Sequence, residues 1–304
     1  MEARHLFVKG ENGNGIFYRL EDFLVYYSIV SILVKEMGLT VLAFCPMFNH
    51  IHFLIESASV PLCRLFILRI ASIFVKEYNV QYKRKGSLFQ KHFGSSRKSG
   101  VKIILGCIAY IFNNPVAGKL YGKAADYKWN MLAYYGNKHP FSKKIRRKEC
   151  RACMRRALSK VDYAWSKKQF LSYGFLQGLL EGLNAEETRQ LTDYIISKYD
   201  FLSFKSLETL YGNYEKMCIA IDSNAGSEYE IEDEYGDHSC YRKMLLTVSR
   251  LGYKGKDLNF ERLPPEELTR IARHIVLRVN APMKCIDKFL HRKVVEDKWL
   301  IFNK

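Results

Sequence analysis

The chain of 304 residues is 48% hydrophobic, enough to bury the core of one large domain or of two ordinary ones. Its formal net charge of +17 favours a polyanion partner, most often nucleic acid, with a generally basic solvated surface as the alternative. A polar N-terminus without a signal peptide, and a longest apolar run (residues 23–34) too short for a bilayer, lead us to expect a cytoplasmic protein with no membrane partner.

The eight cysteines are scattered along the chain. Cys150 and Cys153 form half of a zinc ribbon, but no second Cys-x-x-Cys pair exists. His238 and Cys240 could complete such a site only through the tertiary structure. We therefore predict reduced thiols.

The first part of the chain alternates strand and helix patterns. Residues 5–9 predict a strand, and the Gly- and Asn-rich loop behind them tolerates positive φ angles. Asp22 is the predicted N-cap of a helix that Gly38 stops. Residues 40–45 predict a second strand, which Pro46 interrupts because proline cannot donate to a strand ladder.

Two histidines lie two positions apart in the apolar run 50–56. Side chains of a strand alternate between faces, so His50 and His52 share one face while Ile51 and Phe53 share the other. Two convergent neutral imidazoles can supply two of the ligands of a divalent-metal site. The alternative is a strand with two ordinary, partly buried histidines.

The following elements complete an α+β pattern. We predict a helix at 61–78, a strand at 87–93, a polar basic loop at 95–100 and a helix at 101–113. Asn114 and Pro115 should end or kink this last helix. The order β-α-β-β-α-β-α is compatible with a ferredoxin-like sandwich of helices on an antiparallel sheet. We place the boundary of this unit near residue 140.

Residues 141–304 are predicted to form a basic, mainly helical region. The segment 143–168 is rich in Lys and Arg, which predicts either a phosphate-contacting segment or a solvated helical face. Residues 170–220 predict two or three helices. Residues 222–237 contain acidic side chains and no Lys or Arg, which predicts an exposed loop.

Residues 264–293 predict two helices joined by a short turn at residues 280–282. The arrangement resembles a helix-turn-helix, and a simple helical hairpin is the alternative. In a helix-turn-helix, the DNA would be faced by five basic residues of the second helix and its end: Lys284, Lys288, His291, Arg292 and Lys293.

Tyr110 and Asn114 lie four positions apart, which places them on one face of the predicted helix. A tyrosine can attack a DNA phosphate, but its ordinary pKa of about 10 means that a neutral-pH enzyme must assist it. A divalent cation does so by polarising a phosphate oxygen, and two imidazoles plus an amide oxygen can hold one. Tyr121 and Tyr127 are rival nucleophiles, but neither has an amide side chain four positions on.

Two motifs in this order resemble those of one known family. Residues 47–55 (MFNHIHFLI) are similar to the histidine–hydrophobic–histidine signature of the single-tyrosine HUH transposases. Residues 110–120 (YIFNNPVAGKL) resemble the tyrosine motif of their REP-associated branch. Residues 88–93 and 127–129 also have counterparts there. The resemblance covers about residues 5–136.

The resemblance implies a ferredoxin-like HUH domain that cuts and rejoins single-stranded DNA at hairpins without ATP. By position, His50 and His52 are metal ligands and Asn114 fills the place of the third ligand. Tyr110 is the nucleophile that forms a 5′-phosphotyrosine link. The implied cofactor is Mg²⁺ or Mn²⁺, and the implied partner is single-stranded or hairpin DNA, bound by a monomer or homodimer.

The sequence departs from the family pattern at Phe48, where proline is common, and at Ala117, where arginine is usual. Neither departure removes a proposed catalytic residue. The main alternative is a domesticated HUH fold that binds DNA hairpins with little or no cleavage. A replication or conjugation initiator ranks third, because the sequence has no helicase motif and no second tyrosine paired with Tyr110.

Overall fold

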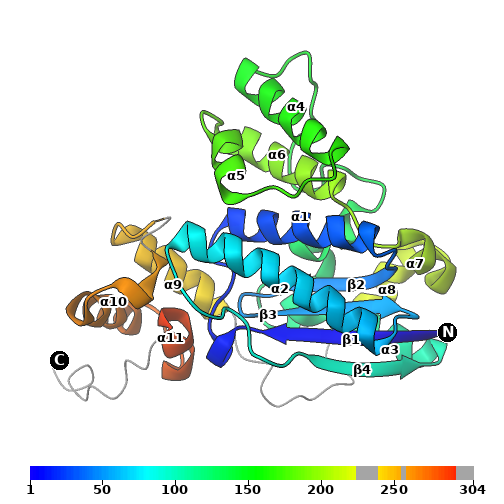
Figure 1. Cartoon of the computed structure of the whole chain (residues 1–304), viewed down its shortest axis with the longest axis horizontal. Coiled ribbons are helices and arrows are strands. Elements are labelled where there is room, and N and C mark those ends of the chain that lie inside the picture. Colours follow the sequence, from blue (N-terminus) through cyan, green and yellow to red (C-terminus); the bar gives the residue numbers. More distant parts are fainter. Residues whose placement is uncertain (224–238, 255–257, 292–304) are drawn as a thin grey trace.

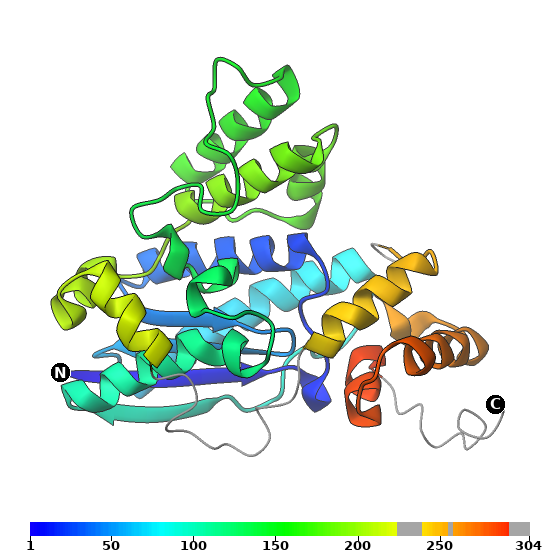
Figure 2. The same ribbon diagram turned by 180° about the vertical axis from the view of Figure 1, so that it is seen from behind.

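The computed structural model describes residues 1–223, 239–254 and 258–291. Its centre is an antiparallel sheet of four strands in the order β2-β3-β1-β4. Helices α1 and α2 cover one face of the sheet and α3 packs on the other (Figure 1, Figure 2). The elements of this part are β1 (Glu2–Lys9), α1 (Leu20–Glu36), β2 (Val41–Pro46), β3 (His50–Glu56), α2 (Val60–Tyr82), β4 (Gly94–Ser99) and α3 (Val101–Ala117).

The predicted α+β class is confirmed, and the order β-α-β-β-α-β on this sheet is compatible with a ferredoxin-like arrangement. The histidine-bearing strand has the bounds that the sequence predicts. Pro46 is the last residue of β2, where it pairs with Ile51 across the hairpin. A proline at a strand end is tolerated because few ladder hydrogen bonds remain to be made there.

The fourth strand does not lie where the sequence analysis places it. Residues 94–99, expected to be a loop, form the edge strand β4, whereas residues 87–93 are irregular. Leu88 and Phe89 are buried, which explains their apolar pattern. The strand itself is polar because it is an exposed edge, where charged side chains discourage pairing with other chains. Gly94 is required here, since a Cβ would overlap the ring of Phe7.

Helix α3 also differs from the prediction. It neither ends nor breaks at Asn114 and Pro115 but continues to Ala117. Pro115 falls in the last turn, and the backbone N–H of Gly118 donates to the carbonyl of Asn114 at 2.8 Å. The helix therefore keeps both Tyr110 and Asn114 within regular α-helical geometry.

The remaining described helices form three groups, the third being α9, α10 and α11. Helices α4, α5 and α6 lie on the outer side of α1, while α7 and α8 pack beside β2 and α3 (Figure 1, Figure 2). Short 3-10 turns connect α3 to this region at Ala124–Asp126, Lys128–Asn130 and Leu132–Tyr134. The helices are α4 (Ala152–Ser166), α5 (Tyr173–Leu180), α6 (Ala185–Lys198), α7 (Phe204–Tyr211), α8 (Tyr214–Ser223), α9 (Ser239–Arg250), α10 (Pro265–Arg278) and α11 (Met283–Leu290).

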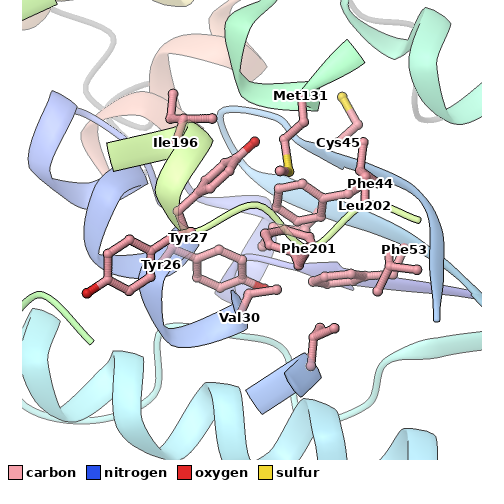
Figure 3. Close-up of a cluster of buried hydrophobic side chains, with 14 of the residues drawn as sticks. Tyr26, Tyr27, Val30, Phe44, Cys45, Phe53, Met131, Ile196, Phe201 and Leu202 are labelled. Carbon is pink, nitrogen blue, oxygen red and sulfur yellow. The ribbon is translucent and has the colours of Figure 1, made fainter. Parts of the chain in front are cut away.

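A buried aromatic cluster joins the two parts of the chain (Figure 3). Phe44 of β2 contacts Phe201, with ring centroids 5.0 Å apart, and Tyr27 of α1 lies 5.5 Å from the same ring. Leu202 forms a parallel bridge with Val41, so residues beyond 200 lie alongside the sheet. The core is therefore continuous across residue 140, and a separately folding unit ending there stays a prediction.

The carboxylate of Asp22 ties α1 to two other helices. Asp22 lies in the first turn of α1 rather than at the N-cap, which is Arg19. Its Oδ2 accepts the backbone N–H groups of Tyr18 and Arg19, and its Oδ1 accepts the hydroxyls of Tyr82 and Tyr173, each at 2.8 Å. Full burial raises the pKa of Asp22 to about 6, against the opposing effect of these hydrogen bonds.

Helices α9, α10 and α11 enclose a second core with Tyr18 and Phe48. The two helices expected in residues 264–293 are present as α10 and α11, and part of the second helix faces the protein. His291 Nε2 lies 2.7 Å from the Tyr18 hydroxyl and 3.0 Å from the Gly15 carbonyl, and the Lys288 side chain lies against Gly13. Both residues are half-buried, so part of each side chain contacts the protein rather than pointing to solvent as expected. Lys284 is exposed.

Other predictions concern features that are described only partly. Arg292, Lys293 and His238 lie outside the described residues, as does all but the start of the acidic segment 222–237. No disulfide joins the eight cysteines, all of which lie in the described ranges, and their reduced state in the cell stays a prediction. Across the described ranges, no helix is both long and apolar enough to cross a bilayer.

Replacing Asp22 with Ala should lower the free energy of unfolding by about 3–5 kcal/mol, because four donors, three of them buried, lose their acceptor. Urea denaturation followed by circular dichroism measures the change. Glu208→Ala, at an exposed acid of α7, is the control and should cost less than about 0.5 kcal/mol. A loss for Asp22→Ala no larger than that of the control would contradict this role.

The same variant should reveal a pH dependence. The folded-state pKa of Asp22, about 6, lies above its ordinary value of 3.8, so its protonation stabilises the fold at low pH and this contribution is lost as pH rises through 6. The stability gap between the wild type and Asp22→Ala should therefore narrow between pH 4 and 6, by up to about 3 kcal/mol. A stability difference between the two proteins that widens from pH 4 to 6 would show that the fold favours the charged form of Asp22 instead.

Candidate metal and tyrosine site

The four residues singled out in the sequence converge on the α3 face of the sheet. His50 and His52 are buried on β3, with ring centroids 5.0 Å apart, and Asn114 and Tyr110 approach from α3. Asn114 Oδ1 lies 3.4 Å from His50 Nε2, and the Tyr110 ring lies edge-on to His52 at 5.6 Å. Strand alternation and helical spacing thus produce one cluster from two distant motifs.

Hydrogen bonds fix the orientation of His50 and its amide neighbours. Asn49 donates through Nδ2 to the Gly13 carbonyl at 3.0 Å, which turns its Oδ1 toward His50 Nδ1 at 2.9 Å. Because that oxygen can only accept, Nδ1 carries the proton, and Nε2 of a neutral His50 holds a lone pair. Asn114 is fixed in the same way, since its Nδ2 donates to the Tyr110 carbonyl at 3.0 Å.

This arrangement points two acceptors at each other. The lone pair on His50 Nε2 faces the oxygen Asn114 Oδ1, a contact that only a proton on the imidazole or a cation between the atoms makes favourable. Both side chains are buried, so water screens the contact poorly. Both atoms are therefore of the kind that coordinates a divalent cation.

His52 supplies a third donor atom. Its Nδ1 lies 2.9 Å from Nε2 of His5, whereas its own Nε2 is buried with no hydrogen-bond partner among the described residues. Burial, assisted by His50, His5 and Lys9, holds the pKa of His52 well below its usual range. A neutral His52 that donates from Nδ1 to His5 leaves an unprotonated Nε2, the state that a metal ligand requires.

His5 is the residue that the sequence analysis missed. It lies on β1 opposite Leu54, on the same face of the sheet as His52, and its ring also contacts Tyr110 edge-on at 5.9 Å. Burial, with a smaller effect of Lys98, lowers the pKa of His5 to about 4, so it is neutral and able to accept. The alternation of residues 5–9 places His5 on one face of a strand. Only the pairing of β1 with β3 shows that His52 lies on the same face.

The residues fit a divalent cation held by His50 Nε2, His52 Nε2 and Asn114 Oδ1. An orphaned buried nitrogen and a pair of opposed acceptors are both features that a bound cation would satisfy. Within the described ranges, no group of three or more His, Cys, Asp or Glu side chains has metal-binding geometry. The candidate site differs from such groups because one of its proposed ligands is the amide of Asn114.

The rival tyrosines differ from Tyr110 in their surroundings. Tyr127 is buried and donates its hydroxyl to the Pro46 carbonyl at 2.5 Å, and burial raises its pKa well above the usual value. Tyr121 is 39% exposed and lies on the segment after α3. Neither ring contacts His50 or His52 in any described interaction, whereas Tyr110 is half-buried against His52.

No protein-family model and no curated protein matches the chain. Among solved structures, the chain is similar to a REP-associated tyrosine transposase bound to a REP hairpin. The aligned part covers 47% of this chain and 86% of that chain, at 11% sequence identity and a TM-score of 0.35. A likeness at this level carries no argument about function, which is therefore built from the residues of the site.

The role of His5 can be tested by metal binding in the absence of DNA. His5→Phe keeps a ring but removes the acceptor for His52 Nδ1, and it should weaken Mn²⁺ binding roughly 10- to 100-fold. His5→Gln, whose amide oxygen can accept the same proton, should retain more of the affinity. Titration of Mn²⁺ followed by electron paramagnetic resonance measures both. His92→Gln, at an exposed histidine, is the control; equal affinities for His5→Phe and the wild type would refute the role.

Proposed function

We propose that this protein is a metal-dependent single-stranded DNA endonuclease and strand transferase with an HUH-type ferredoxin-like domain. The observation that carries the proposal is the Tyr110 ring packed against the buried His52, next to His50, whose Nε2 lies 3.4 Å from Asn114 Oδ1. Neither half of this cluster is unusual alone. Together they provide a nucleophile and a cation site on one face of one sheet.

In the proposed reaction, the Tyr110 oxygen forms a bond to a backbone phosphorus while the bond from that phosphorus to the 3′ oxygen breaks. The products are a 5′-phosphotyrosine link and a 3′-hydroxyl, so the proton lost by the phenol is balanced by one gained at the leaving oxygen. Mg²⁺ or Mn²⁺ held by His50, His52 and Asn114 would polarise the phosphate. Rejoining reverses these steps without ATP, because the phosphodiester energy is kept in the link.

The surroundings of the cluster suit a phosphate. Lys9 on β1 and Lys98 on β4 are close enough to lower the pKa values of His52 and His5, respectively. These two lysines place positive charge beside the candidate metal ligands, where a DNA backbone would need neutralisation. The chain as a whole has a net charge of +17, so its overall charge is also opposite to that of DNA.

The decisive experiment looks for the covalent link. The protein is incubated with end-labelled hairpin DNA that has single-stranded flanks, with Mn²⁺, and is separated on a denaturing gel. We expect an adduct in the wild type that is absent in Tyr110→Phe, since only the attacking oxygen is removed. Tyr163→Phe, at a tyrosine of α4 that is 62% exposed, is the matched control and should keep the adduct.

Two other outcomes have clear meanings. An adduct that persists in Tyr110→Phe would show that another residue is the nucleophile. Tight hairpin binding without an adduct, with either Mg²⁺ or Mn²⁺, would instead favour the alternative function of a DNA-hairpin-binding protein with little or no cleavage.

A further inference from the structure

A cavity of about 320 Å³ lies at the junction of three segments close to the candidate site. It is bounded by the start of α1, the segment that follows α3, and the start of α9. Most of its walls are aromatic, and arginines stand among them. The residues that matter for its chemistry are Phe48, Tyr121, Trp129, Tyr241, Arg19 and Arg242.

Two of the rings that line the cavity are stacked on neighbouring rings. Phe48 stacks on Tyr241 with ring centroids 4.2 Å apart, and Trp129 stacks on Phe23 at the same separation. Tyr121, by contrast, is 39% exposed, more than any other ring of the lining, and contacts Tyr127 at 5.5 Å. The cavity thus has a packed aromatic base and one accessible ring at its mouth.

The charges nearby favour an anionic ligand. Arg242 is exposed on the first turns of α9, and Arg19 lies at the start of α1, where it also pairs with Glu21. A flat aromatic ligand attached to an anionic backbone matches this combination of stacking faces and cations. Unpaired bases of single-stranded nucleic acid have this chemistry, since every base stacks on an aromatic ring while its phosphates need neutralisation.

We propose that this cavity binds one unstacked base of the single-stranded segment of the DNA substrate, with Tyr121 as its stacking partner and Arg242 on an adjoining phosphate. A concave pocket of this size admits a single base but not a base-paired helix. This inference rests on the proposed function for its choice of DNA. It adds a binding site whose proposed stacking residue, Tyr121, and proposed phosphate contact, Arg242, lie outside both sequence motifs.

The cavity is connected to the candidate metal site through the β2–β3 turn. Phe48 is two residues before His50, and Tyr127 donates its hydroxyl to the Pro46 carbonyl on the other side of the turn. A base held against these residues would place the DNA backbone next to the turn that leads into β3, the strand with His50 and His52. Because Tyr241 and Arg242 come from α9, the C-terminal helices also take part in binding DNA.

The test measures binding alone, in EDTA, so that cleavage plays no part. A fluorescently labelled hairpin with a single-stranded flank is prepared as a series in which one abasic site moves along the flank. Fluorescence anisotropy gives the dissociation constant for the wild type, Tyr121→Leu and Tyr121→Trp. Tyr163→Leu, at a tyrosine of α4 that is 62% exposed, is the matched control.

We expect Tyr121→Leu to weaken binding of the intact flank about tenfold, and Tyr121→Trp to retain the affinity. At one position of the flank, the abasic site should weaken wild-type binding by a similar factor and have no further effect in Tyr121→Leu. Such non-additivity identifies a direct contact. Additive losses at every position, or wild-type affinity in Tyr121→Leu, would overturn the proposal.

Salt dependence separates the role of Arg242 from that of Tyr121. Arg242→Ala should reduce the slope of log Kd against log salt by about one, whereas Tyr121→Leu should leave the slope unchanged. An unchanged slope in Arg242→Ala would remove the phosphate contact from the proposal. If the wild type forms no covalent adduct but Tyr121→Leu and the abasic site are non-additive, the nuclease proposal fails and the base-binding pocket stands. If the adduct forms but the losses are additive, the pocket proposal fails and the nuclease stands.

Discussion

The pairing of β1 with β3 is the constraint on which the candidate site depends. In this register Phe7 faces His52 and His5 faces Leu54, so the nitrogens of His5 and His52 meet at 2.9 Å. A slip of one residue would turn the histidines of one strand to the opposite face. The other side of the same strands is filled by the aromatic core, which holds the register because each apolar side chain has only one buried place available.

Local patterns predicted what depends on local geometry. The bounds of β3, the shared face of His50 and His52, and the turn between Tyr110 and Asn114 all follow from strand alternation or helical spacing. Strand β4 could not be found in this way, since an exposed edge strand is selected to be polar. His5 was missed for a different reason: its role is created by a partner 47 positions away.

The helices beyond residue 140 are part of the same architecture rather than an appendage. Asp22 accepts hydroxyl groups from both α2 and α5, Leu202 extends the pairing at β2, and Asn113 donates to the carbonyl of Ile221. The side chain next to Asn114 is therefore anchored by α8. Helix α8, which belongs to neither sequence motif, thus helps to hold α3 and its Tyr110 in position.

The contacts of Tyr18 have a consequence for the order of folding. Its hydroxyl donates to the Phe289 carbonyl, 271 positions along the chain, and contacts His291. Contacts between residues so far apart in sequence form late, because a long loop must close before they contribute any stability. During synthesis, the second core around Tyr18 and Phe48 can therefore assemble only when α11 has left the ribosome. The turn that precedes His50 therefore receives its final support only after α11 has been synthesised.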